Sequence, residues 1–349
     1  MNPSRDRVTV KDVAKFANVS IATVSRVLNG NYYVSPEIAD RVNAAIKELQ
    51  YYPNSVARSL KTRSTKTIGF VVSDISNSYH ITLAKAVEDV ISVEGYNMIV
   101  CSTKGSKERE LTYLQLLQSK NIDGLLLNST AENNDYIASL NMPMILINRK
   151  LKIPNFIGDI IDTDNFQGSY LLTKQLLQLG HRKIFVIKGP KNLNNAFERM
   201  QGFISAMKEY GIVVDDQYPF QFEGNFTLKS GYEAVEQIGS MEEKPTAIIA
   251  LNNMMSVGAL KCMKEKNINA PEDLSIVSYD GIDNLELMST RPSTAQFHPY
   301  EIGRCAGEAI LQRIENPNME NRTFIFPPTM VAGNAVSIPT DNLSQKATW

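Results

Sequence analysis

A short segment near the N-terminus combines small, uncharged side chains with one arginine. In VSIATVSRVLNGN, residues 19–31, Arg26 carries the only charge, and Ile21, Ala22 and Ser25 are small or uncharged. An ordinary amphipathic helix fills its exposed face with Lys and Glu. Short side chains let a helix approach base edges closely, and an arginine can hydrogen-bond to guanine. This face is therefore predicted to meet its partner at close range.

Three predicted helices would hold this face in position. Thr9 is predicted to cap the first helix and Ser20 the second, which runs to about Leu28. Ser35 is predicted to cap the third helix, with Pro36 at its first position. Two short helices, a tight turn and a third packing helix make a helix-turn-helix, whose second helix enters the major groove. The alternative interpretation is a three-helix module that binds another protein.

Charge is distributed unevenly along the chain. Residues 1–63 contain 10 Lys or Arg and 5 Asp or Glu, which leaves 26 basic and 32 acidic residues for the remainder. A basic head on an acidic body is typical of a head that binds a polyanion. The segment from Ser55 to Lys61 can form a helix but is too short to persist alone in water. We expect it to become ordered on binding a partner.

The rest of the chain has the pattern of an α/β protein. Apolar segments such as TIGFVV, GLLLN and LSIVSYD alternate with amphipathic segments such as NFQGSYLLTKQLLQLG. This alternation predicts parallel sheets with helices on both faces. About ten strands exceed one comfortable sheet, so two subdomains are expected, the second starting near Thr163. Because ligands of open α/β sheets bind at the carboxyl ends of the strands, we expect a small molecule in the cleft.

Three segments, TVKDVAKFANVSIATVSRVLNG, YYPNSVARSLKT and TKTIGFVVSDISNSYH, resemble the lactose/galactose repressor family of bacterial transcription regulators. The resemblance extends to about Ile338. It implies an all-α helix-turn-helix head plus an α/β periplasmic-binding-protein-like body of two doubly wound subdomains. The implied divisions are a DNA-binding head at 1–53, a hinge helix and linker at 54–63, a first subdomain at about 64–162 with 297–326, a second at 163–296 with 327–340, and a tail at 341–349.

The resemblance also implies how DNA is bound. In this family the hinge segments of a homodimer fold on a palindromic operator and enter its minor groove. Leu60 would then wedge into the central base step, and Ala57 would allow close approach. The residues predicted to contact DNA are Thr9, Ser20, Ile21, Ala22, Thr23, Ser25, Arg26, Asn29, Tyr33, Asn54, Ala57, Arg58, Leu60 and Lys61.

Candidate effector-binding residues lie at predicted strand ends and near helix starts. They are Asp74, Tyr79, His80, Ser129, Asn148, Arg149, Arg199, Phe226, Asn252 and Asp280. The resemblance places all but Asp74, Ser129 and Arg149 at positions that commonly contact effector. Hydrogen-bonding groups combined with aromatic rings favour a sugar-like ligand. Alternatively, Asp74, Asn252 and Asp280 cap helices and Phe226 belongs to the core.

Several positions depart from the residues usual in the family, and they make the cleft less acidic. His80 replaces an aromatic residue, and Asn148 replaces an aspartate. Arg149 and Arg199 remain, and arginine binds carboxylate or phosphate with two hydrogen bonds. The pattern favours a sugar acid or sugar phosphate. Asp280 opposes this interpretation unless it binds hydroxyls at the other end of the ligand.

Other classes of function fit the sequence less well. It contains no GxGxxG or GxxxxGK[ST] phosphate loop, and its three histidines lack metal-ligand spacing, so neither a cofactor nor a metal is expected. Three distant cysteines are typical of a reducing cytoplasm, and no apolar run is long enough to span a bilayer. The N-terminus lacks the apolar core of a secretory signal. A sugar-metabolising enzyme fused to a DNA-binding head is the weaker alternative.

The sequence therefore predicts a cytoplasmic, homodimeric DNA-binding regulator that is not an enzyme and has no membrane partner. We expect a repressor of carbohydrate-utilisation genes whose affinity for operator DNA is switched by a sugar, sugar acid or sugar phosphate. The alternative is a regulator that needs a corepressor, either a purine-like ligand or a partner protein.

Overall fold

The computed structural model describes residues 8–29, 32–51, 64–154 and 156–339. The chain divides into two compact units, Met1–Thr65 and Lys66–Trp349, which are called the head and the body here. The predicted hinge at 54–63 lies outside the described residues. Among the helices that are described, none is long and apolar enough to cross a membrane.

The head consists of three helices around a small apolar core. They are α1 (Val10–Phe16), α2 (Ile21–Asn29) and α3 (Pro36–Glu48). Thr9 precedes α1, and the Asp12 carboxylate accepts hydrogen bonds from the Thr9 backbone N–H (2.8 Å) and hydroxyl (2.7 Å). Ser20 caps α2 by accepting a hydrogen bond from the Thr23 N–H at 3.1 Å. These local bonds satisfy amide groups that a helix start leaves unpaired.

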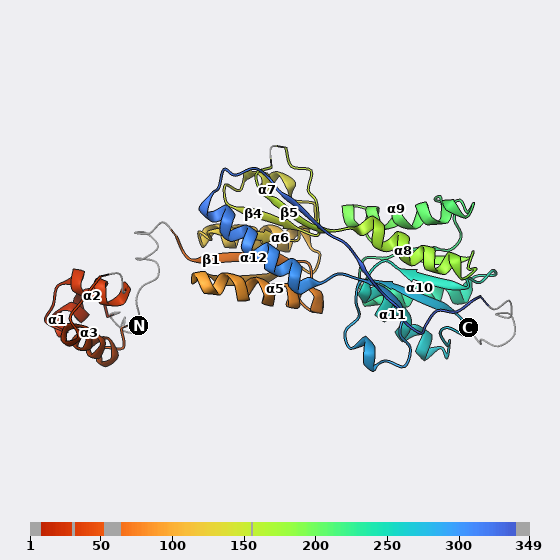
Figure 1. Cartoon of the computed structure of the whole chain (residues 1–349). Coiled ribbons are helices and arrows are strands. Elements are labelled where there is room, and N and C mark those ends of the chain that lie inside the picture. The colour runs from red at the N-terminus through yellow and green to blue at the C-terminus, as the bar shows by residue number, and fades with distance from the viewer. Residues whose placement is uncertain (1–7, 30–31, 52–63, 155, 340–349) are drawn as a thin grey trace, which may run out of the picture. The chain divides into compact units, whose positions relative to one another are not determined.

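The first sheet of the body has the strand order β11-β5-β4-β3-β1-β2, and all its pairs are parallel. The strands are β1 (Thr67–Val72), β2 (Asn97–Ser102), β3 (Gly124–Leu127), β4 (Met144–Ile147), β5 (Asp159–Thr163) and β11 (Thr323–Phe326). The accompanying helices are α5 (Ser78–Ile91), the 3-10 turn η1 (Ser92–Glu94), α6 (Lys107–Ser119), α7 (Asn134–Ser139) and α12 (Pro299–Glu315). Figure 1 shows α5 and α12 running side by side.

Both faces of the first sheet are buried. Phe70 and Val72 of β1 pack in one cluster with Leu83 of α5, whereas the intervening Val71 packs in another with Leu117 of α6. Successive side chains of a strand point to opposite faces, so an uninterrupted apolar strand needs helices on both sides. The apolar segment TIGFVV has this character.

The second sheet has the order β12-β10-β9-β8-β6-β7. Its strands are β6 (Ile184–Lys188), β7 (Gln221–Glu223), β8 (Ala247–Ala250), β9 (Ser275–Tyr279), β10 (Ser293–Gln296) and β12 (Thr329–Val331). All its pairs are parallel except that of β10 with β12. The accompanying helices are α8 (Asn165–Gln178), α9 (Asn194–Glu209), α10 (Leu228–Ser240), α11 (Asn253–Glu265) and the 3-10 turn η2 (Leu285–Leu287).

The chain passes between the two sheets three times. It leaves the first sheet after β5, returns to it after β10 to form α12 and β11, and enters the second sheet again at β12. Figure 1 shows the resulting pair of α/β subdomains joined by several segments. The body has the architecture that the sequence predicted, because its strands form two mainly parallel sheets and not a single large one.

Candidate functional site

The exposed face of α2 carries the side chains that were predicted to contact DNA. Val24 is fully buried in the head core, while Ile21 is 45% exposed and Ala22 and Arg26 are also exposed. The Arg26 guanidinium lies 5.6 Å from the centroid of the Tyr32 ring. The helix therefore presents small side chains and one cation to solvent, as major-groove reading requires.

The remaining predicted DNA contacts are distributed around α2. The hydroxyls of Ser20 and Thr23 lie 2.9 Å apart at its start, Ser25 is partly buried, and Thr9 and Tyr33 are exposed. The side chain of Asn29 is not among those described. The hinge residues Asn54, Ala57, Arg58, Leu60 and Lys61 lie outside the described residues.

A cavity of about 930 Å³ lies in the body and is called the strand-end cavity here. Elements of both subdomains line it, because its walls include residues that follow β1 and β4 of the first sheet and β8 and β9 of the second. Nine of the ten predicted effector residues line the cavity, namely Asp74, Tyr79, His80, Asn148, Arg149, Arg199, Phe226, Asn252 and Asp280. The carboxyl ends of both sheets thus converge on one site.

Ser129 is the exception and corrects the sequence-based set. Its side chain is fully buried, donates a hydrogen bond to Glu110 Oε1 (3.2 Å) and accepts one from the Ala131 N–H (3.0 Å). The buried Glu110 carboxylate holds the serine away from the cavity. The flanking residues Asn128 and Thr130 line the cavity instead.

Four of the cavity residues other than glycine have a left-handed backbone conformation, which is seldom adopted by such residues, and one of them is Lys104, with a φ of 53°. Asn148, Phe226 and Asp280 have φ values of 56°, 62° and 73°. Such left-handed residues cost free energy and cluster at functional sites. Asn252 has a second role as the cap of α11, because its Oδ1 accepts hydrogen bonds from the N–H groups of Met254 (2.9 Å) and Met255 (3.2 Å).

The first subdomain contributes a buried polar wall. Asn148 Nδ2 donates to the Tyr79 hydroxyl at 2.8 Å, and burial raises the pKa of Tyr79, so the phenol stays protonated. His80 Nε2 lies 3.0 Å from Ser73 Oγ. Burial lowers the pKa of His80 to about 4, the positive charge of Arg149 adds to the effect, and the ring is neutral at pH 7.

The second subdomain contributes a fixed guanidinium. Arg199 Nε donates to Asn165 Oδ1 (2.9 Å) and Nη1 to the Leu251 carbonyl (2.8 Å), while the group lies 3.8 Å from the Tyr279 ring centroid. Burial raises the pKa of Asp280 to about 6, although Arg199 opposes that rise. This carboxyl group therefore loses its proton near neutral pH.

Sequence reasoning missed several polar residues of the cavity. Lys104 and Arg109 follow β2, and Asn192, Asn225 and Thr227 come from loops of the second subdomain. Lys104, Asn192, Asn225 and Thr227 stand in loops, and Arg109 lies among other charged residues in the first turn of α6. Only the general rule that ligands bind at the carboxyl ends of strands pointed toward them. Within the described ranges, no cluster of three or more His, Cys, Asp or Glu residues could hold a metal ion.

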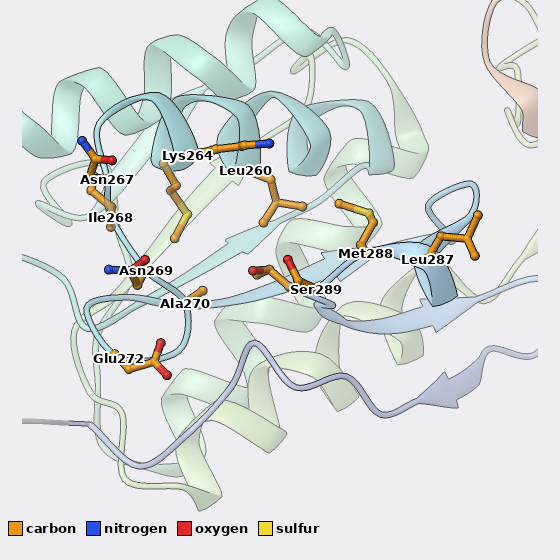
Figure 2. Close-up of a pocket in the computed structure, with 12 residues that line it drawn as sticks. Leu260, Lys264, Asn267, Ile268, Asn269, Ala270, Glu272, Leu287, Met288 and Ser289 are labelled. Carbon is orange, nitrogen blue, oxygen red and sulfur yellow. The ribbon is translucent and has the colours of Figure 1, made fainter.

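A second cavity of about 810 Å³ lies in the second subdomain and shares no lining residue with the first. Figure 2 shows Leu260 of α11 and Met288 facing each other across it, with Asn269 and Ala270 along another side. Apolar and polar side chains line it in equal number, and no motif in the sequence pointed to it.

Comparisons with known proteins agree with this geometry. The family model described as bacterial regulatory proteins, lacI family, matches residues 9–54, and that of periplasmic binding proteins and the sugar binding domain of the LacI family matches residues 65–339. The chain is 35% identical over 338 residues to the HTH-type transcriptional repressor PurR of Haemophilus influenzae, covering 95% of this chain and 99% of that protein. It is 34% identical over 330 residues to the ribose operon repressor of H. influenzae, covering 94% and 98%.

A solved structure extends the similarity to three dimensions. The lac repressor dimer bound to operator and the anti-inducer ONPF is 25% identical to this chain, with a TM-score of 0.81 and coverage of 95% of this chain and 100% of the other. The match spans head and body, so the order of the two units is shared as well.

Proposed function

The chain belongs to the LacI family of bacterial transcriptional repressors, and on that premise we propose that it represses carbohydrate-utilisation genes under the control of a sugar-like metabolite. The strand-end cavity is the observation that carries the proposal. It combines neutral and charged hydrogen-bonding groups with the Phe226 ring, as sugar recognition requires. The similar ribose operon repressor supports a sugar, because its name links it to one.

The proposed DNA contacts follow from the exposed face of α2. Arg26 is proposed to hydrogen-bond a guanine, and Ile21, Ala22 and Ser25 allow the helix to enter the major groove. A single head would bind weakly, so we propose a homodimer that reads a palindromic operator, with the hinge segments in the minor groove. We propose that it acts in the cytoplasm, because a regulator of this kind works where the chromosome lies.

The proposed switch uses the two-sided construction of the cavity. Tyr79 and His80 belong to the first subdomain, whereas Arg199 and Asp280 belong to the second. A ligand that contacts both sides stabilises one arrangement of the subdomains over another. In the proposed dimer, that change alters the spacing of the two hinge segments and hence the affinity for operator.

The first test is independent of the ligand. Selection from a randomised palindromic DNA library should enrich one operator sequence, and fluorescence anisotropy should show about 1000-fold or greater preference for it over random DNA. Recovery of no preferred sequence would contradict the proposed function. A thermal-shift screen of sugars, sugar acids and sugar phosphates then identifies the ligands that stabilise the full chain.

A corepressor mechanism is the second candidate. The Phe226 ring lines the cavity beside the Arg199 guanidinium, 5.4 Å from its centroid, and a planar heterocycle can stack on such a surface. The two mechanisms give opposite signs in one experiment. An inducer lowers the affinity for the selected operator, and a corepressor such as hypoxanthine raises it.

A further inference from the structure

Two buried arginines define an unusual electrostatic feature of the strand-end cavity. Arg149 follows β4 in the first subdomain and is 7% exposed, and Arg199 lies on α9 in the second and is 8% exposed. Burial lowers the pKa of Arg149 to about 10, and repulsion from Arg199 contributes. The two guanidinium groups are thus close enough to repel each other across the cavity.

Neither guanidinium pairs with a carboxylate in the described part of the chain. Arg149 Nη1 donates to the Ser129 carbonyl, and its buried Nε has no partner there. Arg199 donates only to the neutral oxygens of Asn165 and Leu251. The Nη2 atoms of both arginines make no hydrogen bond to the described residues, and both side chains line the cavity.

Among the described residues, the acids near the cavity form no ion pair with Arg149 or Arg199. Asp74 and Glu132 line the cavity but are exposed to water. Glu110, whose charge favours the ionised form of Arg149, is fully buried and is held by donors from Ser129, Thr130 and Asn133. Asp280 lies near Arg199 and is mostly ionised at pH 7, because its pKa is about 6, but within the described ranges it forms no ion pair with either guanidinium.

Burying a cation without a paired anion is costly. Two such cations that face one cavity from opposite subdomains leave a site that an anion would stabilise. We propose that the ligand of the strand-end cavity is an acid, a sugar acid or a phosphorylated sugar, whose anionic group is bound by Nη2 of Arg149 and Nη2 of Arg199. The proposal rests on the proposed function, since it assigns the chemical class of the metabolite that controls the repressor.

The rest of the cavity suits the remainder of such a ligand. Asp280 and Asn252 belong to the second subdomain and offer oxygen acceptors, and Tyr79 offers a phenol from the first. These groups bind sugar hydroxyls. An anion held between Arg149 and Arg199 also removes their mutual repulsion and joins the two subdomains. The acidic group would therefore drive the same rearrangement that changes operator affinity.

Calorimetric titration with matched pairs of ligands tests this proposal on the full-length wild-type protein. The pairs are D-glucose with D-gluconate and glucose 6-phosphate, D-galactose with D-galacturonate, and D-ribose with ribose 5-phosphate. We expect at least one acid to bind at least about 10-fold more tightly than its neutral partner. Preference for gluconate or galacturonate identifies a carboxylate ligand, and preference for a phosphate ester identifies a phosphorylated one.

Substitution of Arg149 assigns the preference to this site. Arg149→Gln should weaken binding of the acid more than binding of its neutral partner, so that the preference for the acid falls about 10-fold or more, and Arg149→Lys should restore part of that preference. Arg291→Gln is the matched control, because Arg291 is exposed, lies outside the cavity and makes its described hydrogen bonds through its backbone. If Arg149→Gln does not fold, the wild-type comparison decides the question alone.

Three results would overturn the proposal. The first is a neutral sugar or hypoxanthine that binds as tightly as every acid in the panel. The second is acid binding that Arg149→Gln leaves unchanged. The third is a wild-type protein that selects its operator but binds none of the acids. The third result would contradict the acidic ligand but not the proposed repressor function. Failure to select any operator would contradict the proposed function itself.

Discussion

The head and the body hold their charged binding groups in opposite environments. Arg26 on α2 is exposed to solvent, whereas Arg149 and Arg199 in the strand-end cavity are 7% and 8% exposed. An exposed arginine costs the folded head little, and DNA supplies the counter-charge when it binds. A buried arginine costs the folded body free energy, and a ligand that removes this cost shifts the conformation of the body. The comparison predicts large ligand effects in the body and moderate, local effects in the head.

The largest expected effect is the loss of a buried charge from the cavity. Arg199→Ala should weaken binding of the cavity ligand by about 2–5 kcal/mol, or at least about 30-fold, because a desolvated ionic contact disappears. Binding of the ligand-free protein to operator should not change. Calorimetry and operator anisotropy measure the two quantities. Wild-type ligand affinity in Arg199→Ala would remove this residue from the site, and loss of operator binding would indicate a structural role.

The next effect is the pH dependence of folding stability that Asp280 and His80 produce. The pKa of Asp280 is raised to about 6 from the ordinary 3.8, so its contribution to stability is present at low pH and is lost as pH rises from about 4 to about 6. The pKa of His80 is lowered to about 4 from 6.5, so its contribution is present above pH 6.5 and is lost as pH falls toward 4. Each shift corresponds to at most about 3 kcal/mol.

Single variants separate these opposite dependences. The free energy of unfolding of wild type minus that of Asp280→Asn should fall as pH rises through this range, and the same difference for His80→Asn should rise. Urea unfolding followed by circular dichroism at several pH values measures both. Arg149 and Asp74 face His80, and Arg199 and Asp283 face Asp280, so these charges are kept in every variant. Two flat difference curves would show that neither group titrates differently on folding.

A moderate effect is expected for Arg26, the arginine proposed to read a base. Arg26→Ala should cost about 1–3 kcal/mol on the selected operator, or about 5- to 150-fold in affinity, and should relax the preference at one base pair in each half-site. Lys15→Ala is the matched control, because it also removes one exposed positive charge from the head, on α1. Anisotropy with the operator and with random DNA makes the measurement. Equal losses on both DNAs would show that Arg26 contacts phosphate and does not read a base.

The smallest effect is a local one at the start of α1. Asp12→Ala removes the carboxylate that accepts two hydrogen bonds from Thr9 and so weakens the capping of α1. Amide hydrogen exchange should therefore become about 5-fold faster in α1 and stay the same in the body. Asp40→Ala on α3 serves as a control with an exposed carboxylate. Unchanged exchange in Asp12→Ala would mean that this cap contributes nothing.

Sequence reasoning succeeded where structure depends on neighbouring residues. The caps Thr9 and Ser20 and the apolar strands β1, β3, β4, β6, β8 and β9 could be identified from short patterns. The strands β5, β10, β11 and β12 were not among the segments identified. β5 carries the buried acids Asp159 and Asp162, and β10 reads STAQ, so neither has the apolar character by which a buried strand is recognised. Their place in a sheet depends on distant partners.

In the cavity, too, the position of a single side chain can depend on a distant residue that short sequence patterns do not reveal. Parallel strands bring their carboxyl ends to one edge, so the residues after β1, β4, β8 and β9 could be assigned to one site. Ser129 follows β3 in the same way, yet the buried Glu110 on α6 takes its hydroxyl away from the cavity. That contact joins residues 19 positions apart and leaves no local pattern.

The central claim is that the strand-end cavity and the DNA-binding surface are thermodynamically coupled. Its most direct test is an anisotropy titration of the selected operator with wild type and Arg199→Gln, each with and without a saturating acid found by calorimetry. The wild-type midpoint should shift at least about 10-fold with the acid, and operator should change acid affinity by the same factor. Arg199→Gln should show no shift at the same acid concentration. A wild-type midpoint that does not move while the acid occupies the cavity would contradict the claim.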